Sequence, residues 1–69
     1  MPTAAAIENL RLAEQAMYSA QRELMNYISR SDRFTPEGIA EHERLADNVM
    51  QKTTEYMEAF RAAARSDHA

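Results

Sequence analysis

The stretch YISRSDRFTPEG, residues 27–38, decides the fold, because it is the one part of the chain that does not read as helix. Its FTPEG segment predicts a helix start, with Thr35 as the N-cap and Pro36 at the first helical position. Glu37 then stands in the first turn, where the helix dipole favours a negative charge. The preceding residues 29–32, SRSD, have the composition of a turn. We therefore expect the chain to reverse direction here.

On both sides of this turn the composition favours helix. The flanking segments are rich in Ala, Leu, Glu, Gln, Arg and Met, which are all good helix formers. Neither Pro nor Gly occurs between Thr3 and Ser29. We expect helices over about 4–29 and 36–65, a turn over about 30–35, and a frayed polar tail over 66–69.

Apolar residues recur every three or four positions in both segments, which is the pattern of a coiled-coil seam. The first stripe is Ala6, Leu10, Ala13, Met17, Ala20, Leu24 and Tyr27; the second is Ile39, His42, Ala46, Val49, Thr53, Tyr56, Phe60 and Ala63. A short turn makes the two helices antiparallel neighbours. Tyr27 is then expected opposite Ile39, and Ala6 opposite Phe60. The predicted fold class is all-α: an antiparallel two-helix hairpin with a coiled-coil-like seam.

A chain of 69 residues can bury only a small core, and such chains usually need a disulfide, a metal or an oligomer for stability. The absence of cysteine excludes disulfides and thiolate zinc sites. Oligomerisation or a protein partner is therefore the expected source of further stability.

Several large apolar residues lie off the predicted seam. They are Ile7, Leu12, Tyr18, Met25 and Ile28 in the first helix, and Leu45, Met50 and Met57 in the second. Tyr18 and Met25 are one heptad apart, and so are Met50 and Met57, so each pair extends an apolar line beside its seam.

These off-seam residues have three possible uses. They could close a symmetric dimer, a four-helix bundle, which we favour because twofold homodimers are the commonest oligomers. They could instead bind a helix of a different protein, since Met adapts to varied surfaces. A monomer with ordinary exposed apolar groups is the third reading. For a partner or dimer interface we predict Leu12, Tyr18, Met25, Leu45, Met50 and Met57.

No arrangement of residues predicts catalysis. The chain has no phosphate loop or Ser-His-Asp pattern, and a two-helix hairpin offers no pocket that would shift the pKa values of paired carboxylates. We predict that the protein is not an enzyme and has no catalytic, cofactor or metal residues and no small-molecule substrate. His42 is expected to be a half-buried histidine satisfied by a neighbour, with a metal-binding or pH-switch role as the alternative.

The turn supplies secondary contact candidates: Arg30, Arg33 and Phe34. The arginines could meet phosphate or an acidic partner, although a net charge of −3 argues against nucleic acid as a partner. Phe34 precedes the N-cap, so we expect it to pack on Ile39 as a hydrophobic staple, or else to be an exposed contact residue.

The sequence thus predicts a small acidic protein–protein interaction module of adaptor, chaperone or inhibitor type, acting through apolar helix flanks. The alternative is a nucleic-acid-associated regulatory dimer that uses the turn arginines. The first residues do not resemble a secretory signal, and no apolar run is long enough to span a membrane. We expect a cytoplasmic location, with export by a route independent of a signal peptide left open.

Overall fold

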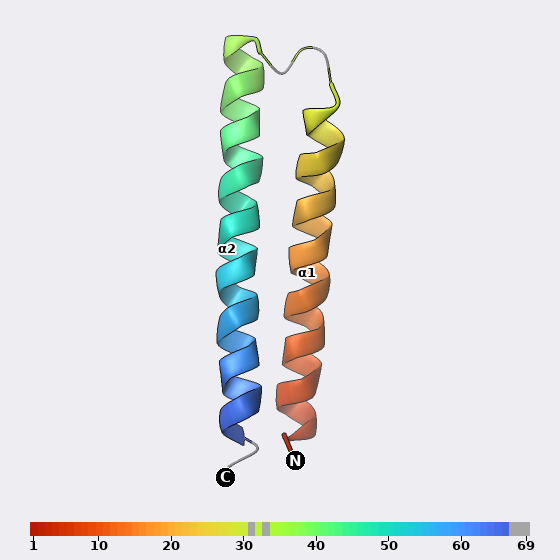
Figure 1. The fold of residues 1–69 in the computed structure, drawn as a ribbon, viewed down its shortest axis with the longest axis vertical. Helices are drawn as coiled ribbons and strands as arrows, with labels where there is room; N and C mark the ends of the chain where they lie inside the picture. Colours follow the sequence, from red (N-terminus) through yellow and green to blue (C-terminus); the bar gives the residue numbers. More distant parts are fainter. Residues whose placement is uncertain (31, 33, 67–69) are drawn as a thin grey trace.

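The computed structural model describes residues 1–30, 32 and 34–66 and contains two helices. Helix α1 spans Ala4–Ile28 and helix α2 spans Pro36–Ser66. The two run antiparallel, side by side, with both chain ends at the same end of the molecule (Figure 1). The hairpin is elongated, measuring 51 × 14 × 11 Å. The all-α hairpin predicted from the sequence is confirmed.

Side-chain hydroxyls cap the starts of both helices. Thr3 is the N-cap of α1, and its Oγ1 accepts the Ala6 amide at 3.1 Å. Thr35 caps α2 as predicted, because its Oγ1 accepts the Gly38 amide at 3.0 Å. The Thr35 hydroxyl also donates to the carbonyl of Asp32 at 2.9 Å, which ties the turn to the helix start. Each cap satisfies an amide that has no partner within its helix.

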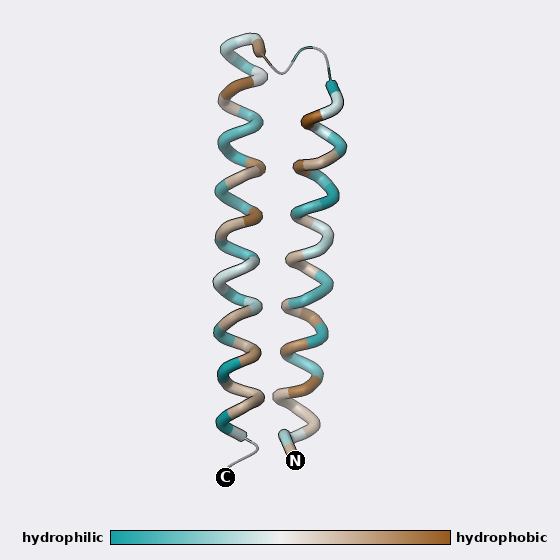
Figure 2. The backbone as a smooth tube through the Cα atoms, viewed as in Figure 1, coloured by the Kyte–Doolittle hydropathy of each residue, from teal (hydrophilic) through white to brown (hydrophobic). Residues whose placement is uncertain are grey.

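The seam of α1 is the predicted stripe. Met17, Ala20 and Tyr27 are buried, and the other four stripe residues are half-buried. Hydropathy along the chain shows the same arrangement, with apolar segments recurring on the sides where the helices face each other (Figure 2).

The seam of α2 differs from the prediction at Ile39 and Phe60, whereas the predicted seam residues Ala46 and Thr53 are half-buried at its border. His42, Val49, Tyr56 and Ala63 are half-buried or buried as expected. The intervening seam positions centre one residue earlier than predicted, on Gly38, Leu45, Lys52 and Ala59, and the seam extends to Ser66. The assignments of Ile39 and Phe60 to the seam are therefore wrong, since these side chains are 47% and 52% exposed.

A contact near the turn explains this rotation of α2. The Tyr27 hydroxyl donates to the Gly38 carbonyl at 2.6 Å, in a buried position. Glycine has no side chain, so α1 can approach α2 closely here and the Gly38 side of α2 turns inward. Tyr27 therefore meets Gly38 rather than Ile39, and its ring also lies edge-on to His42 at 6.4 Å between centroids.

At the open end a second hydrogen bond joins the helices. The Thr3 amide donates to Ser66 Oγ at 3.2 Å, and that hydroxyl donates to the Ala63 carbonyl at 2.8 Å. Ala63 is buried there, whereas Phe60 is 52% exposed, so the predicted pairing of Ala6 with Phe60 is wrong. Ser66, which was assigned to the tail, ends α2; residues 67–69 lie outside the described part of the chain.

Candidate interaction face

One side of the hairpin collects most of the large apolar residues that the seam leaves out. They are Ile7, Tyr18, Met25 and Ile28 on α1, and Ile39, Met50, Met57 and Phe60 on α2. Each of them directly follows a seam residue, so each is rotated from the seam by about 100° in the same sense. Because the helices run in opposite directions, this common rotation brings both sets to the same side of the hairpin. We call this side the apolar face.

The apolar face is well exposed in the single hairpin. Met25 is 65% exposed and Met50 is 61% exposed, and all the others except the half-buried Ile28 are exposed. On α2 the face also holds Ala46, Thr53 and Ala64, and Glu43 is the only charged member of this α2 half. The α1 half is more polar, because its remaining positions are Ala4, Arg11, Glu14 and Gln21. The strongest apolar surface therefore runs along α2.

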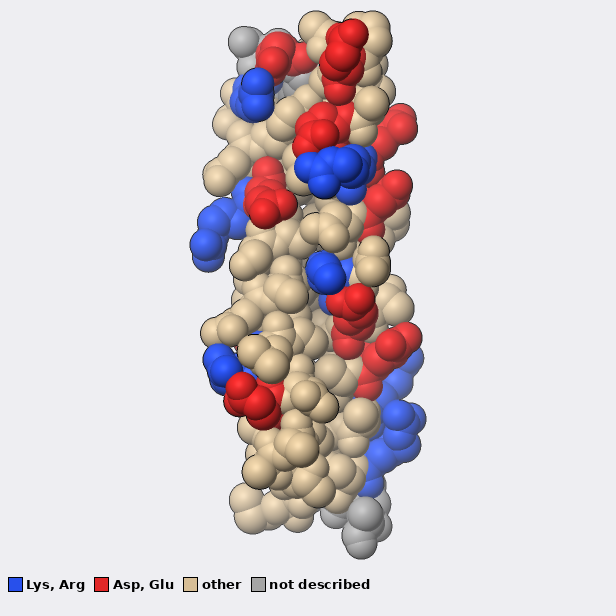
Figure 3. All heavy atoms as spheres, turned by 180° about the vertical axis from the view of Figure 1, so that it is seen from behind, with Lys and Arg blue, Asp and Glu red and all other residues tan. Residues whose placement is uncertain are grey.

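The opposite side of the seam is polar. Its α2 residues include Glu41, Arg44 and Glu55. Glu41 pairs with Arg44 along the helix, and Glu55 pairs with Lys52, which reaches it from the half-buried seam position. Figure 3 views the hairpin from behind, where side chains of both charges intermix along its length. We call this side the polar face.

Ion pairs shift the acidity of the groups that form them. Hydrogen bonds from Arg44 lower the pKa of Glu41 below its ordinary value of 4.5, and the charges of Arg44 and Arg30 act in the same direction. On α1, hydrogen bonds from Arg11 likewise lower the pKa of Glu8. These carboxylates are exposed, so their role is surface charge and local helix support.

The predicted interface residues divide into three groups. Tyr18, Met25, Met50 and Met57 all lie on the apolar face, and the hairpin brings them to one side. Leu12 precedes the seam residue Ala13, so it lies on the polar side and is separated from this group. Leu45 is only 6% exposed within the single hairpin. Its placement at an interface is wrong, because α2 is rotated so that Leu45 packs in the seam.

The turn candidates have local contacts. The Arg30 guanidinium bonds both carboxylate oxygens of Asp32, at 3.0 and 3.2 Å, and its central carbon lies 5.5 Å from the centroid of the Tyr27 ring. Arg33 lies outside the described residues. Arg30 is thus already engaged at the turn with a carboxylate and an aromatic ring.

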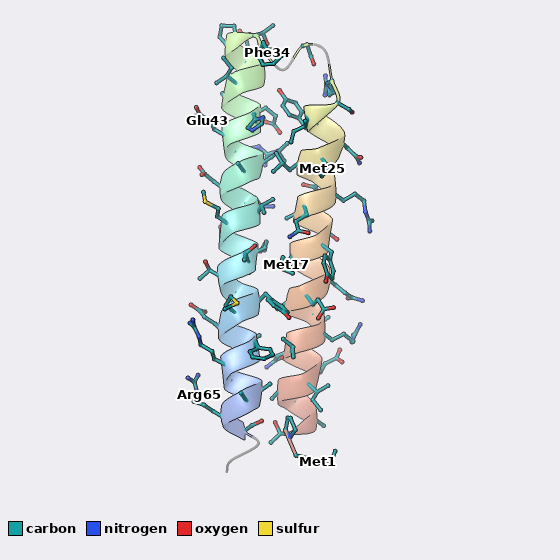
Figure 4. All side chains as sticks on the ribbon, viewed as in Figure 1. Met1, Met17, Met25, Phe34, Glu43 and Arg65 are labelled. Atoms are coloured by element: carbon teal, nitrogen blue, oxygen red, sulfur yellow. The ribbon has the colours of Figure 1, made fainter. Side chains whose placement is uncertain are left out.

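A shallow pocket of about 220 Å³ opens beside the start of α2. Phe34, Ile39, His42 and Glu43 line it. Figure 4 shows Phe34 over the start of α2, while Met17 lies between the helices. Phe34 shares the pocket wall with Ile39, as a staple would require, yet its side chain stays 74% exposed. The pocket lies on the same side of the seam as the apolar face and extends it toward the turn.

His42 is half-buried and contacts Tyr27 through its ring. Among the residues the structure describes, no three His, Cys, Asp or Glu side chains group so that they could hold a metal ion. Over the same residues, neither helix has the length and apolar content needed to cross a bilayer.

Two residues of the apolar face, Ile39 and Phe60, escaped the sequence reasoning because the stripe rule assigned them to the seam. One signal was present: Gly38 marks a point of close helix approach, and a seam drawn through it runs through Leu45 and Ala59 instead. Comparison with known protein families, curated proteins and solved structures finds no match to this chain.

Proposed function

We propose that this protein is a small non-catalytic protein–protein interaction module, of adaptor, chaperone or inhibitor type, that binds through its apolar face. The same face is proposed to associate hairpins into a four-helix bundle. One observation carries the proposal. Most of the large apolar residues that the seam leaves out collect on one side, and the ion pairs Glu41–Arg44 and Lys52–Glu55 lie on or toward the other. An exposed apolar surface bordered by polar residues is the usual mark of a protein interaction site.

The size of this surface supports a role in binding. Met25, Met50 and Phe60 are each more than half exposed. Covering such side chains is worth about 25 cal/mol per Å² of apolar area. Three methionines or aromatics at an interface can therefore supply several kcal/mol, comparable to the whole stability expected of a domain this small. Methionine and aromatic residues are also enriched at protein interfaces.

The turn arginines give less support to nucleic-acid binding. The carboxylate of Asp32 already pairs with Arg30, which reduces the positive charge that the turn can offer to phosphate. The net charge of −3 has the same sign as a nucleic acid backbone. We therefore place protein binding first.

Charge insertion on the apolar face tests the proposal. The double variant Met50→Glu/Met57→Glu adds two carboxylates where the isolated hairpin is already exposed, so its helices should persist. The control Gln15→Glu/Gln51→Glu adds the same charge at exposed positions away from the apolar face. Size-exclusion chromatography with light scattering measures self-association over a dilution series, pull-down measures capture of other proteins, and circular dichroism measures helicity.

The proposal expects the Met50→Glu/Met57→Glu chain to lose association while keeping its helicity, and the control to keep both. If the two variants associate equally, or if the parent chain associates with nothing, the apolar face is not a binding surface and the proposal fails.

A further inference from the structure

The single hairpin leaves more surface exposed than a monomer of its mass should. Its accessible area is 5117 Å². A compact protein of 7.9 kDa exposes about 4,400 Å². The difference of roughly 700 Å² is close to the area of about 800 Å² that each partner buries in a standard interface. The buried apolar core is correspondingly thin: Met17, Ala20, Tyr27, Leu45 and Ala63.

We propose that a second copy of this chain covers the apolar face, packed face to face with its turn at the opposite end. In this dimer Phe60 of each copy enters the pocket of the other. The inference rests on the proposed function, because it names the occupant of the same face and the geometry in which that occupant binds.

The pattern of side-chain size along α2 supports this geometry. When α2 packs antiparallel on α2 of the second copy, with the twofold axis between Met50 and Thr53, large residues meet small ones. Ile39 comes level with Ala64, Met57 with Ala46, and Met50 with Thr53. Alternation of large and small side chains is what a close-packed helix interface requires.

The same axis places Phe60 level with Glu43 of the second copy, where the pocket opens. The pocket walls are Phe34, Ile39, His42 and Glu43, and its volume of about 220 Å³ suits one large side chain. Phe60 is 52% exposed in the single hairpin and has no place in its own seam. The aromatic ring and the pocket thus complement each other across the axis.

The α1 helices are compatible with this axis. The hydrogen bonds of the hairpin hold Thr3 near Ser66 and Tyr27 near Gly38, so the axis position on α2 corresponds to a level close to Ala16 on α1. Around that level Ile7 comes opposite Met25 of the second copy. In the same way, Ile28 comes opposite Ala4, and the Tyr18 hydroxyl comes opposite the Glu14 carboxylate. The polar residues in the middle of the α1 half therefore find polar neighbours.

The other face-to-face arrangement, with both turns at one end, fits poorly. It stacks α1 of one copy on α2 of the second copy. Residues that lie side by side within one hairpin are then also level with each other between the two copies. Ile7 then meets Phe60, Tyr18 meets Met50, and Ile28 meets Ile39, so large side chains collide at three levels. The same register buries the Glu43 carboxylate against Met25, with no cation opposite it. Overpacking and burial of an unpaired charge are both destabilising.

Distances between spin labels distinguish the two arrangements. The chain has no cysteine, so Arg65→Cys and Gln51→Cys, both exposed and off the apolar face, each carry one label per copy. With turns at opposite ends, each label at 65 lies about 20 Å along the bundle from the axis, because the helix rises about 1.5 Å per residue. The two labels lie on opposite sides of the axis, so they are about 40 Å apart. With turns at the same end they lie at one level, separated only by the bundle width of about 20 Å. Labels at 51 lie level with the axis, so in either dimer only the bundle width of about 20 Å separates them.

The Phe60→Ala variant tests the pocket contact directly. Truncating an aromatic anchor that fills a pocket in an interface should raise the dimer dissociation constant by roughly thirtyfold. The matched control is Leu12→Ala, because Leu12 is equally exposed in the hairpin but lies on the opposite side. Its dissociation constant should change less than about threefold.

A dimer with a long distance at 65, a short one at 51 and a strong effect of Phe60→Ala supports the inference. A dimer with short distances at both sites overturns the geometry but leaves the apolar face as the binding surface. A chain that is monomeric at every concentration overturns the second copy as the occupant. The proposed function fails by a different result, namely equal association of the Met50→Glu/Met57→Glu variant and its control.

Discussion

Removing one hydroxyl group at the turn end of the seam tests the physical account of the fold. Tyr27 is buried, and its hydroxyl donates to the Gly38 carbonyl at 2.6 Å. The Tyr27→Phe variant keeps the ring and its packing against His42 but loses this hydrogen bond. A buried hydrogen bond contributes about 1 kcal/mol net to stability, within a range of about 0.5–1.5. The carbonyl belongs to the first turn of α2 and keeps its helical bond, so the larger penalty for an orphaned group does not apply.

In a domain of this size a loss of about 1 kcal/mol lowers the melting temperature by about 4–8 °C. Circular dichroism of thermal unfolding measures the midpoint, and all chains are compared at one concentration because association raises apparent stability. The matched control is Tyr18→Phe, since Tyr18 lies on the apolar face with its side chain about half exposed. Its free energy of unfolding should change by less than about 0.5 kcal/mol. Equal midpoints for the two variants would refute the view that this bond fixes the rotation of α2.

Three further predictions concern the helix start, the corrected seam and acid. Thr35→Ala removes the cap on the Gly38 amide and should cost about 1 kcal/mol, whereas Thr35→Ser should cost less, as measured by urea unfolding. Leu45→Ala opens the thin core and should cost about 2–5 kcal/mol, enough to abolish most helicity in circular dichroism. Hydrogen bonds from Arg44 lower the pKa of Glu41 in the folded chain, so its contribution to stability is present above about pH 4.5 and is lost as the pH falls through the lowered pKa. Melting temperature against pH should show this loss, and Glu41→Gln should reduce it.

Each of these predictions has an outcome that contradicts it. Equal stability of the alanine and serine variants at position 35 would mean that the hydroxyl does not cap α2. Full helicity of Leu45→Ala would return Leu45 to the surface, as the heptad pattern first suggested. An identical acid response of the parent and Glu41→Gln would assign the pH dependence to other carboxylates.

The sequence predicted the hairpin and the seam of α1, because Pro36 and Thr35 mark the helix start and one apolar line runs along the first helix. It did not predict the rotation of α2. That helix has apolar residues on two adjacent lines, one through Leu45 and one through Phe60, and periodicity cannot choose between them. The choice depends on a contact between residues on different helices, the bond of Tyr27 to Gly38.

The apolar face was predicted in part for the same reason. Met50 and Met57 lie beside either possible seam of α2, so both seams leave them exposed, and their role at an interface stays a prediction. Phe60 and Leu45 exchange roles when the helix turns, and a stripe drawn from sequence alone assigned both of them wrongly. Leu12 was grouped with Tyr18 because both are off the seam, although they lie on opposite sides of it.

The uneven division of side chains around the seam limits how far copies of this hairpin can assemble. A hairpin that was apolar on both sides could add copies without end, as an open stack. Here the second side carries the Glu41–Arg44 and Lys52–Glu55 pairs, and stripping water from such charges costs free energy that their attraction rarely recovers. In the proposed dimer the polar faces remain outside, and a third copy would have to bind against these ion pairs. Such an assembly is therefore expected to stop at the pair, and a higher concentration would produce more dimers and not longer stacks.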